Sequence, residues 1–454
     1  MEKRKFTNEH LLYLIAFVCA LVMRLANLGE MPLSESEASW ALQAYEVSQG
    51  EAAAISGQPA YVLLTGTIFA IFSSSDTLAR LLPALVGSMI VWLPFALRYR
   101  LGKMACLVFA FGLALDPGLV AVSRIAGGPM LAFGFGVLAA AAWLLEAPVT
   151  AGILGGLALM SGPPILTGLV GLAVAWALWS STRKENLALP ALPFRRAAIA
   201  CGITILLAGT LFMRHPQGLS AMVAAIPDYL GGWFQAAATP LSQVYLALLV
   251  YQPLAVVFGI IAMVRKSTWK NSTTQLLGFW FVAALVLTSA YPSRQVSDLI
   301  WVLVPLWGLA GYELDRHLRP TSQETQVVAW GQAILIIVFM VFFWLNLSNL
   351  SALGSVAVPQ DFNLLDLNDI DPIIRQNILR VVMVIVVPIF AALSVTLVGI
   401  GWSYEEAGRG TVWGTLIILG LYITGTAWST GHPRNKAAND LWTPSPAPGY
   451  SNLL

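Results

Sequence analysis

The sequence predicts an all-α polytopic membrane protein, and three observations support this prediction. The chain has 454 residues, of which 57% are hydrophobic and only 11% are charged. Its mean hydropathy is +0.74, and a water-soluble globular protein of this size needs a more polar surface. Apolar runs long enough to form membrane-spanning helices recur along the whole chain. A net charge of +2 is too small to predict a nucleic-acid partner.

About thirteen of these runs are expected to cross the bilayer, since a spanning helix needs about 20 apolar residues. They lie at residues 11–28, 79–97, 104–122, 129–147, 148–160, 165–180, 197–213, 241–264, 275–290, 299–312, 328–346, 378–400 and 411–428. We therefore expect one transmembrane domain, residues 1–428. The remaining tail, residues 429–454, is rich in Pro, Gly, Ser and Asn and is expected to be external and flexible.

The apolar stretch YVLLTGTIFAIF at 61–72 is too short for a span and is expected to form an interfacial helix instead. The basic stretches MEKRK, RYRLGK, STRKENLALPALPFRR and VRKSTWK then share one side, and that side holds most of the 25 Lys and Arg residues. The positive-inside rule places it in the cytoplasm, together with the N-terminus. The loops at 29–78, 214–240 and 347–377 are then external to the plasma (cell inner) membrane.

The first external loop contains the segment MPLSESEASWALQAYEVSQGE, which predicts a short helix between Glu35 and Gly50. Ser34 or Ser36 can cap its start, so that Glu35 and Glu37 lie at the positive end of the helix dipole. An apolar stripe is expected to cover one face, formed by Ala38, Ala41, Leu42 and Tyr45. Two interpretations of the acids stay open, because they either only favour the helix dipole or act as a general base.

Further charged residues are expected at the same external surface. Arg124 and Arg294 lie at span edges, where a guanidinium either binds phosphate through paired hydrogen bonds or extends to lipid headgroups. Asp298 follows Arg294 by four positions and is a candidate to pair with it. Asp116 lies inside an apolar zone and needs a partner, for which Arg124 is the candidate.

No metal site is predicted from the sequence. The four histidines and three cysteines are scattered, with no metal-ligand spacing. One histidine, His215, opens the external loop HPQG, which either closes over an acceptor or forms an ordinary turn.

The order of several weak motifs resembles that of the GT-C membrane glycosyltransferases, in their protein O-mannosyltransferase and aminoarabinose transferase branch. The motifs are LSESEASWALQA, QPAYVLLTGTIFAIF, DTLARLLPALVGS, RYRLG, ALDPGLVAVSR and SRQVSDLIWVLVPL, across roughly residues 10–320. The resemblance implies a GT-C-like helix bundle with interfacial helices in the first external loop. It also implies an enzyme that transfers a sugar from a polyprenyl-phosphate donor to a protein, lipid or glycan acceptor on the external face. Its partners would be that donor and the membrane lipid.

The resemblance also implies roles for individual residues. Members carry an Asp-Glu pair in the first external loop, where this chain has Ser36-Glu37, so Glu37 matches the second acid and Glu35 stands in for the first. Both are candidates for the catalytic base. Gln58 replaces the lysine or proline that relatives carry before Pro59.

Many members also carry an Asp that contributes to a metal or acceptor site after the third span. Here that place reads IAGGP, with Gly127 and Gly128. This turn contains no acid, so no cofactor is assigned, but the resemblance still leaves a divalent cation, Mg or Mn, open. The candidate substrate-binding residues are Arg294, Arg124, Gln58, Asp298 and His215.

Two alternative functions stay open. One follows from the differences from the family pattern at Ser36 and at the IAGGP turn, and the other follows from the membrane fold. One is a catalytically degenerate GT-C protein that acts as a binding or assembly partner in envelope glycan handling. The other is a transporter of lipid-linked sugars, which would place polar groups at mid-membrane depth. This sequence gathers its acids and arginines at the outer edge instead.

Overall fold

The computed structural model describes the chain in eight segments. These are residues 8–51, 55, 57–182, 193–237, 239–318, 323–351, 372–430 and 441–442. Every regular element within these segments is a helix, which confirms the predicted all-α class. The chain divides into two compact units, the first made of residues 1–315 and 423–454 and the second of residues 316–422.

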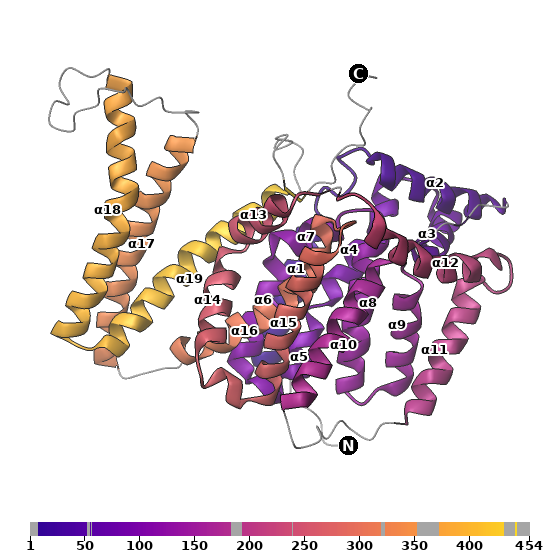
Figure 1. Cartoon of the computed structure of the whole chain (residues 1–454), viewed down its shortest axis with the longest axis horizontal. Coiled ribbons are helices and arrows are strands. Elements are labelled where there is room, and N and C mark those ends of the chain that lie inside the picture. The colour runs from indigo at the N-terminus through magenta and orange to yellow at the C-terminus, as the bar shows by residue number, and fades with distance from the viewer. Residues whose placement is uncertain are drawn as a thin grey trace. The chain divides into compact units, whose positions relative to one another are not determined.

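The first unit contains most of the helices (Figure 1). Its α-helices are α1 (Asn8–Leu25), α2 (Glu35–Gln49), α3 (Pro59–Phe72), α4 (Asp76–Met89), α5 (Trp92–Leu101), α6 (Lys103–Leu115), α7 (Pro117–Ser123), α8 (Gly128–Leu144), α9 (Pro148–Leu159), α10 (Pro164–Thr182), α11 (Phe194–Gly209), α12 (Gln217–Gly231), α13 (Leu241–Tyr251), α14 (Pro253–Val264), α15 (Ser272–Ala290) and most of α16 (Ile300–Leu318). Short 3-10 turns are η1 (Gly232–Phe234), η2 (Thr268–Lys270) and η3 (Val296–Leu299).

All thirteen apolar runs predicted to span the membrane fall on helices. Within the described residues, seven helices are long and apolar enough to cross a bilayer, or up to nine if two bent pairs each count as one span. Three further apolar helices, α3, α8 and α9, are shorter. The structure therefore supports a multi-pass membrane protein, and the number thirteen stays a prediction.

Proline interrupts both bent pairs. The axis turns by 50° between α6 and α7, where Pro117 follows Asp116, and by 93° between α13 and α14, where Pro253 follows Gln252. Proline lacks the N–H that an unbroken helix needs and clashes with the preceding turn. Asp116 starts α7 by accepting a hydrogen bond from the N–H of Leu119 at 2.9 Å.

Helix α2 has the bounds that its sequence predicts. It begins after Ser34, whose N–H donates to the Glu37 carboxylate at 2.9 Å, and it ends at Gly50, whose φ is +77°. Glycine adopts this left-handed conformation without the steric cost that other residues meet. The predicted start after Ser34 and the predicted end at Gly50 are thus confirmed.

The predicted apolar stripe of α2 is wrong. The helix buries Glu37, Ala41, Ala44 and Val47, whereas Leu42 and Tyr45 are exposed. Because Glu37 is buried by its ion pair with Arg80, the packed face of the helix is rotated relative to the predicted stripe. The exposed Leu42 and Tyr45 suit a helix that lies at a membrane surface.

Helix α3 packs directly under α2, and a glycine permits the close approach. A Cβ atom on Gly66 would lie 2.8 Å from the carbonyl oxygen of Ala44 and 2.9 Å from Val47. With 14 residues, α3 is about 21 Å long, shorter than the hydrocarbon core of a bilayer. Its predicted interfacial position stays a prediction.

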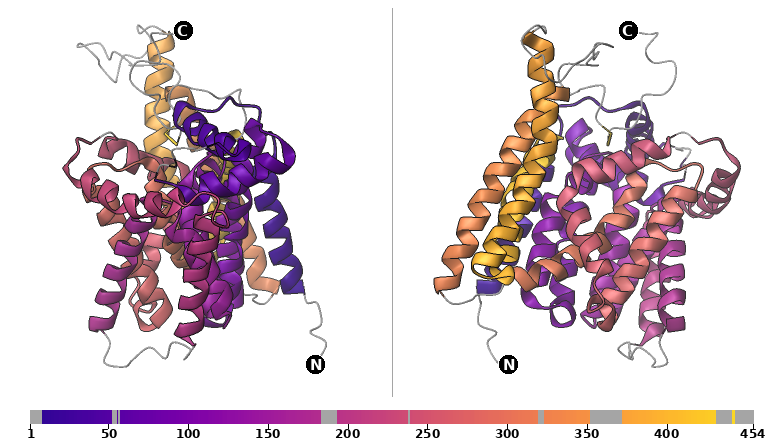
Figure 2. Two further views of the ribbon diagram at one scale, coloured as in Figure 1. Left: turned by 90° about the vertical axis from the view of Figure 1, so that its right-hand side faces the viewer. Right: turned by 60° about the vertical axis from the view of Figure 1, so that its left-hand side comes forward.

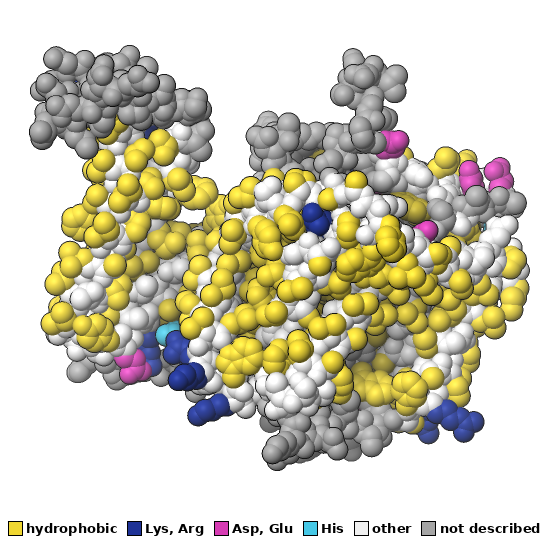
Figure 3. Space-filling model, in the orientation of Figure 1, with side chains coloured by type: hydrophobic (Ala, Val, Ile, Leu, Met, Phe, Trp, Pro, Cys, Tyr) yellow, Lys and Arg dark blue, Asp and Glu magenta, His cyan; other side chains and the backbone are white. Residues whose placement is uncertain are grey.

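The charged side chains of the first unit lie mainly at its two ends. Figures 1 and 2 show α2, α3 and α12 at the end opposite the start of α1. In Figure 3, Lys and Arg gather at the lower edge of this unit and Asp and Glu at the upper edge, with hydrophobic side chains covering the face between them. This distribution suits a helix bundle surrounded by lipid.

The second unit is built around α17 (Gln323–Ser351), α18 (Pro372–Gly401) and most of α19 (Tyr404–Ser429). Gln332 of α17 donates to Ser394 of α18 at 3.2 Å. Gly410 lets α19 approach α17, because a Cβ there would lie 2.3 Å from a backbone carbonyl. Residues 352–371 of the predicted external loop 347–377 lie outside the described residues, as does most of the tail.

Candidate functional site

An ion pair between α2 and α4 is the centre of the candidate site. The Arg80 guanidinium donates from Nε to Glu37 Oε1 at 2.8 Å and from Nη2 to Glu37 Oε2 at 2.9 Å. Both residues are buried, at 5% exposure each. A two-point pair of this kind fixes the relative orientation of the two side chains.

Glu37 accepts further hydrogen bonds from the backbone around it. Its Oε1 also accepts from the N–H of Ala126 at 2.8 Å, and its Oε2 accepts from both the N–H and the hydroxyl of Ser34 at 2.9 Å. Burial on its own would raise the pKa of Glu37, but Arg80 and these N–H groups outweigh burial and hold the pKa below its usual value. Glu37 is therefore a fixed carboxylate anion at neutral pH.

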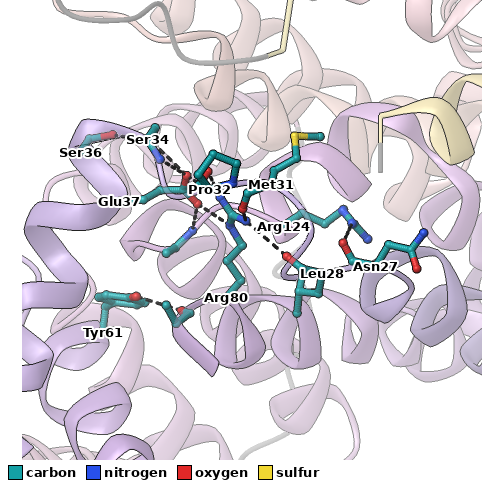
Figure 4. Close-up of polar contacts among 12 residues, drawn as sticks. Asn27, Leu28, Met31, Pro32, Ser34, Ser36, Glu37, Tyr61, Arg80 and Arg124 are labelled. Atoms are coloured by element: carbon teal, nitrogen blue, oxygen red, sulfur yellow. Dashed lines mark hydrogen bonds and ion pairs between the residues drawn. The ribbon is translucent and has the colours of Figure 1, made fainter. Parts of the chain in front are cut away.

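A cavity of about 290 Å³ lies beside this ion pair. The charged residues of its wall are Glu37, Arg80 and Arg124. Figure 4 shows their side chains together with the chain that follows α1. Thr430 and Trp442 close it from the C-terminal part of the chain. The structure thus brings one predicted acid and one predicted arginine to a single hollow, at the α2 end of the first unit.

Arg124 closes the end of α1 with its guanidinium. Its Nη1 donates to the carbonyls of Met23, Arg24 and Ala26 at 2.7 to 3.3 Å, and its Nη2 donates to that of Asn27 at 3.0 Å. The last carbonyls of a helix have no partner within the helix, and a cation there also meets the negative end of the dipole. Burial, followed by the nearby charge of Arg80, lowers the pKa of Arg124 to about 10, so it stays cationic.

Three other arginines also donate to backbone carbonyls at helix ends or in loops. Arg24 donates to the carbonyls of Leu113 and Ala114 at the end of α6. Arg80 donates to those of Leu28, Met31 and Pro32, which follow α1. Arg294, predicted to bind substrate, is 8% exposed and donates to the carbonyls of Ser289 and Tyr291 at the end of α15 and to that of Thr239, which precedes α13. Arg24, Arg124 and Arg294 thus close the ends of helices, whereas Arg80 binds the loop that follows α1.

Gln58 holds the IAGGP turn against the start of α3. Its side-chain oxygen accepts from the N–H of Gly128 at 2.7 Å. A Cβ on Gly128 would lie 3.0 Å from this amide and 2.3 Å from the carbonyl oxygen of Ser161. The glycine is therefore required by packing, and Gln58 is the residue that positions the turn.

The remaining predicted residues lie apart from the cavity. Asp298 is 9% exposed and accepts from the N–H of Gln295 at 2.9 Å, at the start of η3. The pair predicted with Arg294 is not formed among the described residues, because Arg294 turns to carbonyl oxygens instead. His215 is buried at the start of α12, and Glu35 is exposed in the first turn of α2.

Asp116 has a different partner from the one that the sequence suggested. Its Oδ2 accepts from the indole N–H of Trp307 at 2.8 Å, and its Oδ1 accepts from the N–H of Leu119. Arg124, the predicted partner, instead binds the end of α1. Asp116 is fully buried, at 0% exposure, and these donors supply the partners that a buried carboxyl group needs.

Two residues of the site were missed at the sequence level. Arg80 is not among the residues predicted for the site, and Trp442 lies in the tail predicted to be flexible. An arginine at the start of the apolar run 79–97 is costly without a partner, and this signal could have identified Arg80. Trp442 is 3% exposed and occupies space that Gly118 leaves open, and no local pattern predicts this contact.

The described residues contain no group of three or more His, Cys, Asp or Glu side chains that could hold a metal ion. The divalent cation left open by the sequence stays a prediction. Neither of the acids proposed as a base has a second carboxylate among its hydrogen-bond partners.

Comparison with known proteins gives a match at the level of structure. None of the protein-family models matches the chain, and no curated protein matches it. The structure is similar to the crystal structure of ArnT from Cupriavidus metallidurans bound to undecaprenyl phosphate, with a TM-score of 0.56 and 17% identity over 92% of this chain and 77% of that chain. The apo state of the same protein gives a TM-score of 0.54 and 17% identity, over 93% and 78%.

ArnT, an aminoarabinose transferase, is a member of the GT-C superfamily. The likeness extends beyond the region that carried the sequence resemblance, since it includes more than nine-tenths of the chain. At this level of identity it establishes the fold. The chain therefore has the GT-C membrane fold.

Proposed function

We propose that the chain is an integral-membrane glycosyltransferase that takes a sugar from a polyprenyl-phosphate donor and transfers it on the external face of the plasma membrane. The observation that carries this proposal is the cavity lined by Glu37, Arg80 and Arg124 at the α2 end of a GT-C bundle. The ArnT structure of the same fold was solved with undecaprenyl phosphate bound, which supports a carrier of this class.

The reaction is an inverting displacement. An acceptor hydroxyl gives its proton to a carboxylate, and its oxygen forms a bond to the anomeric carbon of the donor sugar. The bond between that carbon and the phosphate oxygen breaks, and polyprenyl phosphate leaves with the electron pair. The positive charges of Arg80 and Arg124 at the cavity wall favour the phosphate as its negative charge grows.

The two candidate acids take different roles in this proposal. Glu37 already accepts five hydrogen bonds, while a carboxylate offers about four lone-pair sites. It cannot take a proton without losing a structural partner, so we assign it to positioning α2. Glu35 has an exposed carboxylate two positions earlier in the same helical turn, and we assign it as the general base.

A second candidate function follows from the same geometry. Glu35 is absent from the cavity lining, and Glu37 is fully engaged in structural hydrogen bonds. A GT-C protein that binds the lipid carrier without transferring its sugar would have such a site. It would act as a binding or assembly partner in envelope glycan handling.

A transfer assay separates the two functions. Purified protein is given a panel of polyprenyl-phosphate sugars with acceptor lipids, glycans and peptides, and transfer is compared for the native chain, Glu35→Gln and Glu37→Gln. Glu46→Gln, on the same helix, is the matched control. General-base catalysis contributes about 10²–10⁴-fold, so Glu35→Gln should lower kcat by about that factor while donor binding and the Glu46→Gln rate are unchanged.

Other outcomes have clear meanings. Full activity in Glu35→Gln would remove this residue as the base. Tight binding of polyprenyl phosphate with no transfer from any donor would favour the binding protein over the enzyme. Absence of both binding and transfer would refute the assignment of this cavity.

A further inference from the structure

A second cavity, of about 320 Å³, lies within the helices of the first unit and is almost entirely apolar. It is lined from α5, α8, α10, α15 and α16, by residues such as Leu97, Val137, Leu169, Leu277 and Trp301. It is separate from the site beside Glu37. Helix α8 begins at Gly128, next to Gln58, whereas its cavity-lining positions run from Gly136 to Leu144, at the other end of the helix.

The cavity opens on the side of the helix bundle. Its lining residues Leu169 and Leu172, both on α10, are 43% and 36% exposed. Helix α10 is among the helices long and apolar enough to span a bilayer, so the side of this helix faces lipid. Hydrocarbon chains of the membrane can therefore enter without crossing water.

The size of the cavity suits a segment of a hydrocarbon chain. An apolar cavity of about 150 Å³ in a protein core stays dry and can hold a benzene ring, and this cavity is about twice that volume. Burying apolar surface of a ligand here is favourable at about 25 cal/mol per Å². An apolar cavity of this kind gives water too few polar partners to hold it.

One end of the cavity lies beside exposed basic residues. Leu97 lines it, and Arg100 follows three positions later on the same side of α5. Thr273 also lines it, three positions after Lys270. The side chain of Asn271 donates to the carbonyl oxygen of Arg100 at 3.3 Å, which brings these two segments together.

We propose that this cavity holds one acyl chain of an anionic phospholipid, whose phosphate lies against Arg100 and Lys270. Both side chains are exposed, at the end of the bundle that carries the basic loops. The acyl chain fills the space between α8, α10 and α15, and the ester groups stay near Thr273. The lipid is a structural ligand of the bundle, and the proposal does not depend on sugar transfer.

A glycine in the cavity wall provides the test. A Cβ on Gly136 would have only ordinary contacts, 3.5 Å from Ile165 and 3.7 Å from Trp301, so larger side chains at this position grow into the cavity. Gly155 on α9 is the matched control, because no atom lies within 4 Å of its Cβ position. The variants are Gly136→Ala, Gly136→Leu and Gly155→Leu.

The measurement is native mass spectrometry of the full chain, purified in detergent and then mixed with phosphatidylglycerol, phosphatidylcholine or a polyprenyl phosphate. We expect one phosphatidylglycerol to be retained by the native chain and by Gly155→Leu, with at least a tenfold loss of occupancy in Gly136→Leu and a smaller loss in Gly136→Ala. Arg100→Gln combined with Lys270→Gln should abolish the preference for phosphatidylglycerol over phosphatidylcholine.

Three results would overturn the proposal. Equal lipid retention in Gly136→Leu and Gly155→Leu would show that no chain occupies this cavity. If the native chain retained polyprenyl phosphate instead of phospholipid, and Gly136→Leu lost it, the cavity would be a binding site for the polyprenyl carrier. An unchanged lipid preference in the double glutamine variant would show that Arg100 and Lys270 do not bind the headgroup. Gly136→Ala keeps the test valid if Gly136→Leu fails to fold.

Discussion

Glu37 and Arg80 are joined by two hydrogen bonds of 2.8 and 2.9 Å, although 43 positions separate them in the sequence. The pair connects the first turn of α2 to α4, and Arg80 extends the connection to the carbonyls that follow α1. Because the pair is buried, removing one partner leaves an uncompensated charge. The position of the loop between α1 and α2 therefore depends on this contact.

Arg80→Met should destabilise the protein by about 3–5 kcal/mol, because the buried Glu37 carboxylate loses its cation. The double variant Arg80→Met with Glu37→Leu should recover much of this loss, since no charge is then left unpaired. Thermal unfolding in detergent measures both changes. Purely additive losses in the double variant would contradict the coupling of the two residues.

The Glu37 carboxylate also predicts how the stability of the protein depends on pH. The pKa of Glu37 is lower in the folded protein than its ordinary value of 4.5. Its contribution to stability is therefore complete above about pH 4.5 and is lost as the pH falls through the lower, folded-state value. Unfolding temperatures of the native chain should fall more steeply below pH 4.5 than those of the double variant, which has no acid at this position.

Asp298 predicts the opposite dependence on pH. Burial raises its pKa from 3.8 to about 6, although the hydrogen bond from the N–H of Gln295 opposes this shift. The folded state therefore holds a proton that the unfolded state releases between pH 3.8 and 6. Stability should fall as the pH rises through this window, by an amount on the order of 1–3 kcal/mol.

Asp298→Asn keeps an acceptor for the Gln295 N–H and removes the titration. Unfolding temperatures measured at pH 4, 5, 6 and 7 should show the loss across the window in the native chain and a flatter profile in the variant. Parallel profiles for the two proteins would contradict the raised pKa.

Gly118 and Trp442 predict a compensating pair of substitutions. A Cβ on Gly118 would lie 2.3 Å from the Trp442 ring, so Gly118→Ala should displace the ring and destabilise the protein by about 1–3 kcal/mol. In the Trp442→Ala background the same change should cost clearly less, because the ring is gone and only the side-chain end of Gln252, 2.9 Å from the added Cβ, still has to move. A double-mutant cycle on unfolding free energies measures the coupling of the two residues. A coupling energy near zero would show that Trp442 does not pack against Gly118.

The hydrogen bond from Trp307 to the buried Asp116 leads to a prediction about the free energy of unfolding. Trp307→Phe keeps the ring but removes the N–H that binds Asp116 Oδ2 at 2.8 Å. The expected loss is about 1–3 kcal/mol. In the Asp116→Ala background the same substitution should cost less, and an equal cost in both backgrounds would show that the hydrogen bond contributes little.

Much of the fold could be predicted from the sequence because apolar runs and helix-ending residues act locally. Ser34 and Gly50 mark the limits of α2, whereas residues 104–122 were predicted as one run and are divided at Pro117 into α6 and α7. The weak motifs also identified the GT-C fold correctly, although no single one of them is specific. These signals depend on a few neighbouring residues and need no knowledge of tertiary packing.

The roles of the charged residues could not be predicted in the same way. The carbonyls bound by Arg124 lie about 100 positions earlier in the chain, and those bound by Arg80 lie about 50 positions earlier. Which carbonyls lie beside a guanidinium depends on how helices pack, and no local pattern records this. The sequence therefore predicted the positions of Arg124 and Arg294 at span edges, but it did not reveal the helix-end carbonyls that both residues bind.

The arginines that close helix ends also bear on how distant relatives of this chain should be compared. A guanidinium can reach several carbonyls at once, whereas the ammonium of lysine is a point charge on a flexible stem. Selection at Arg24 and Arg294, which lie outside the cavity lining, should therefore retain arginine even in relatives that act on different substrates. Agreement at these two positions would indicate a shared architecture, whereas differences at the cavity wall, which includes Arg80 and Arg124, would bear on the substrate of each relative.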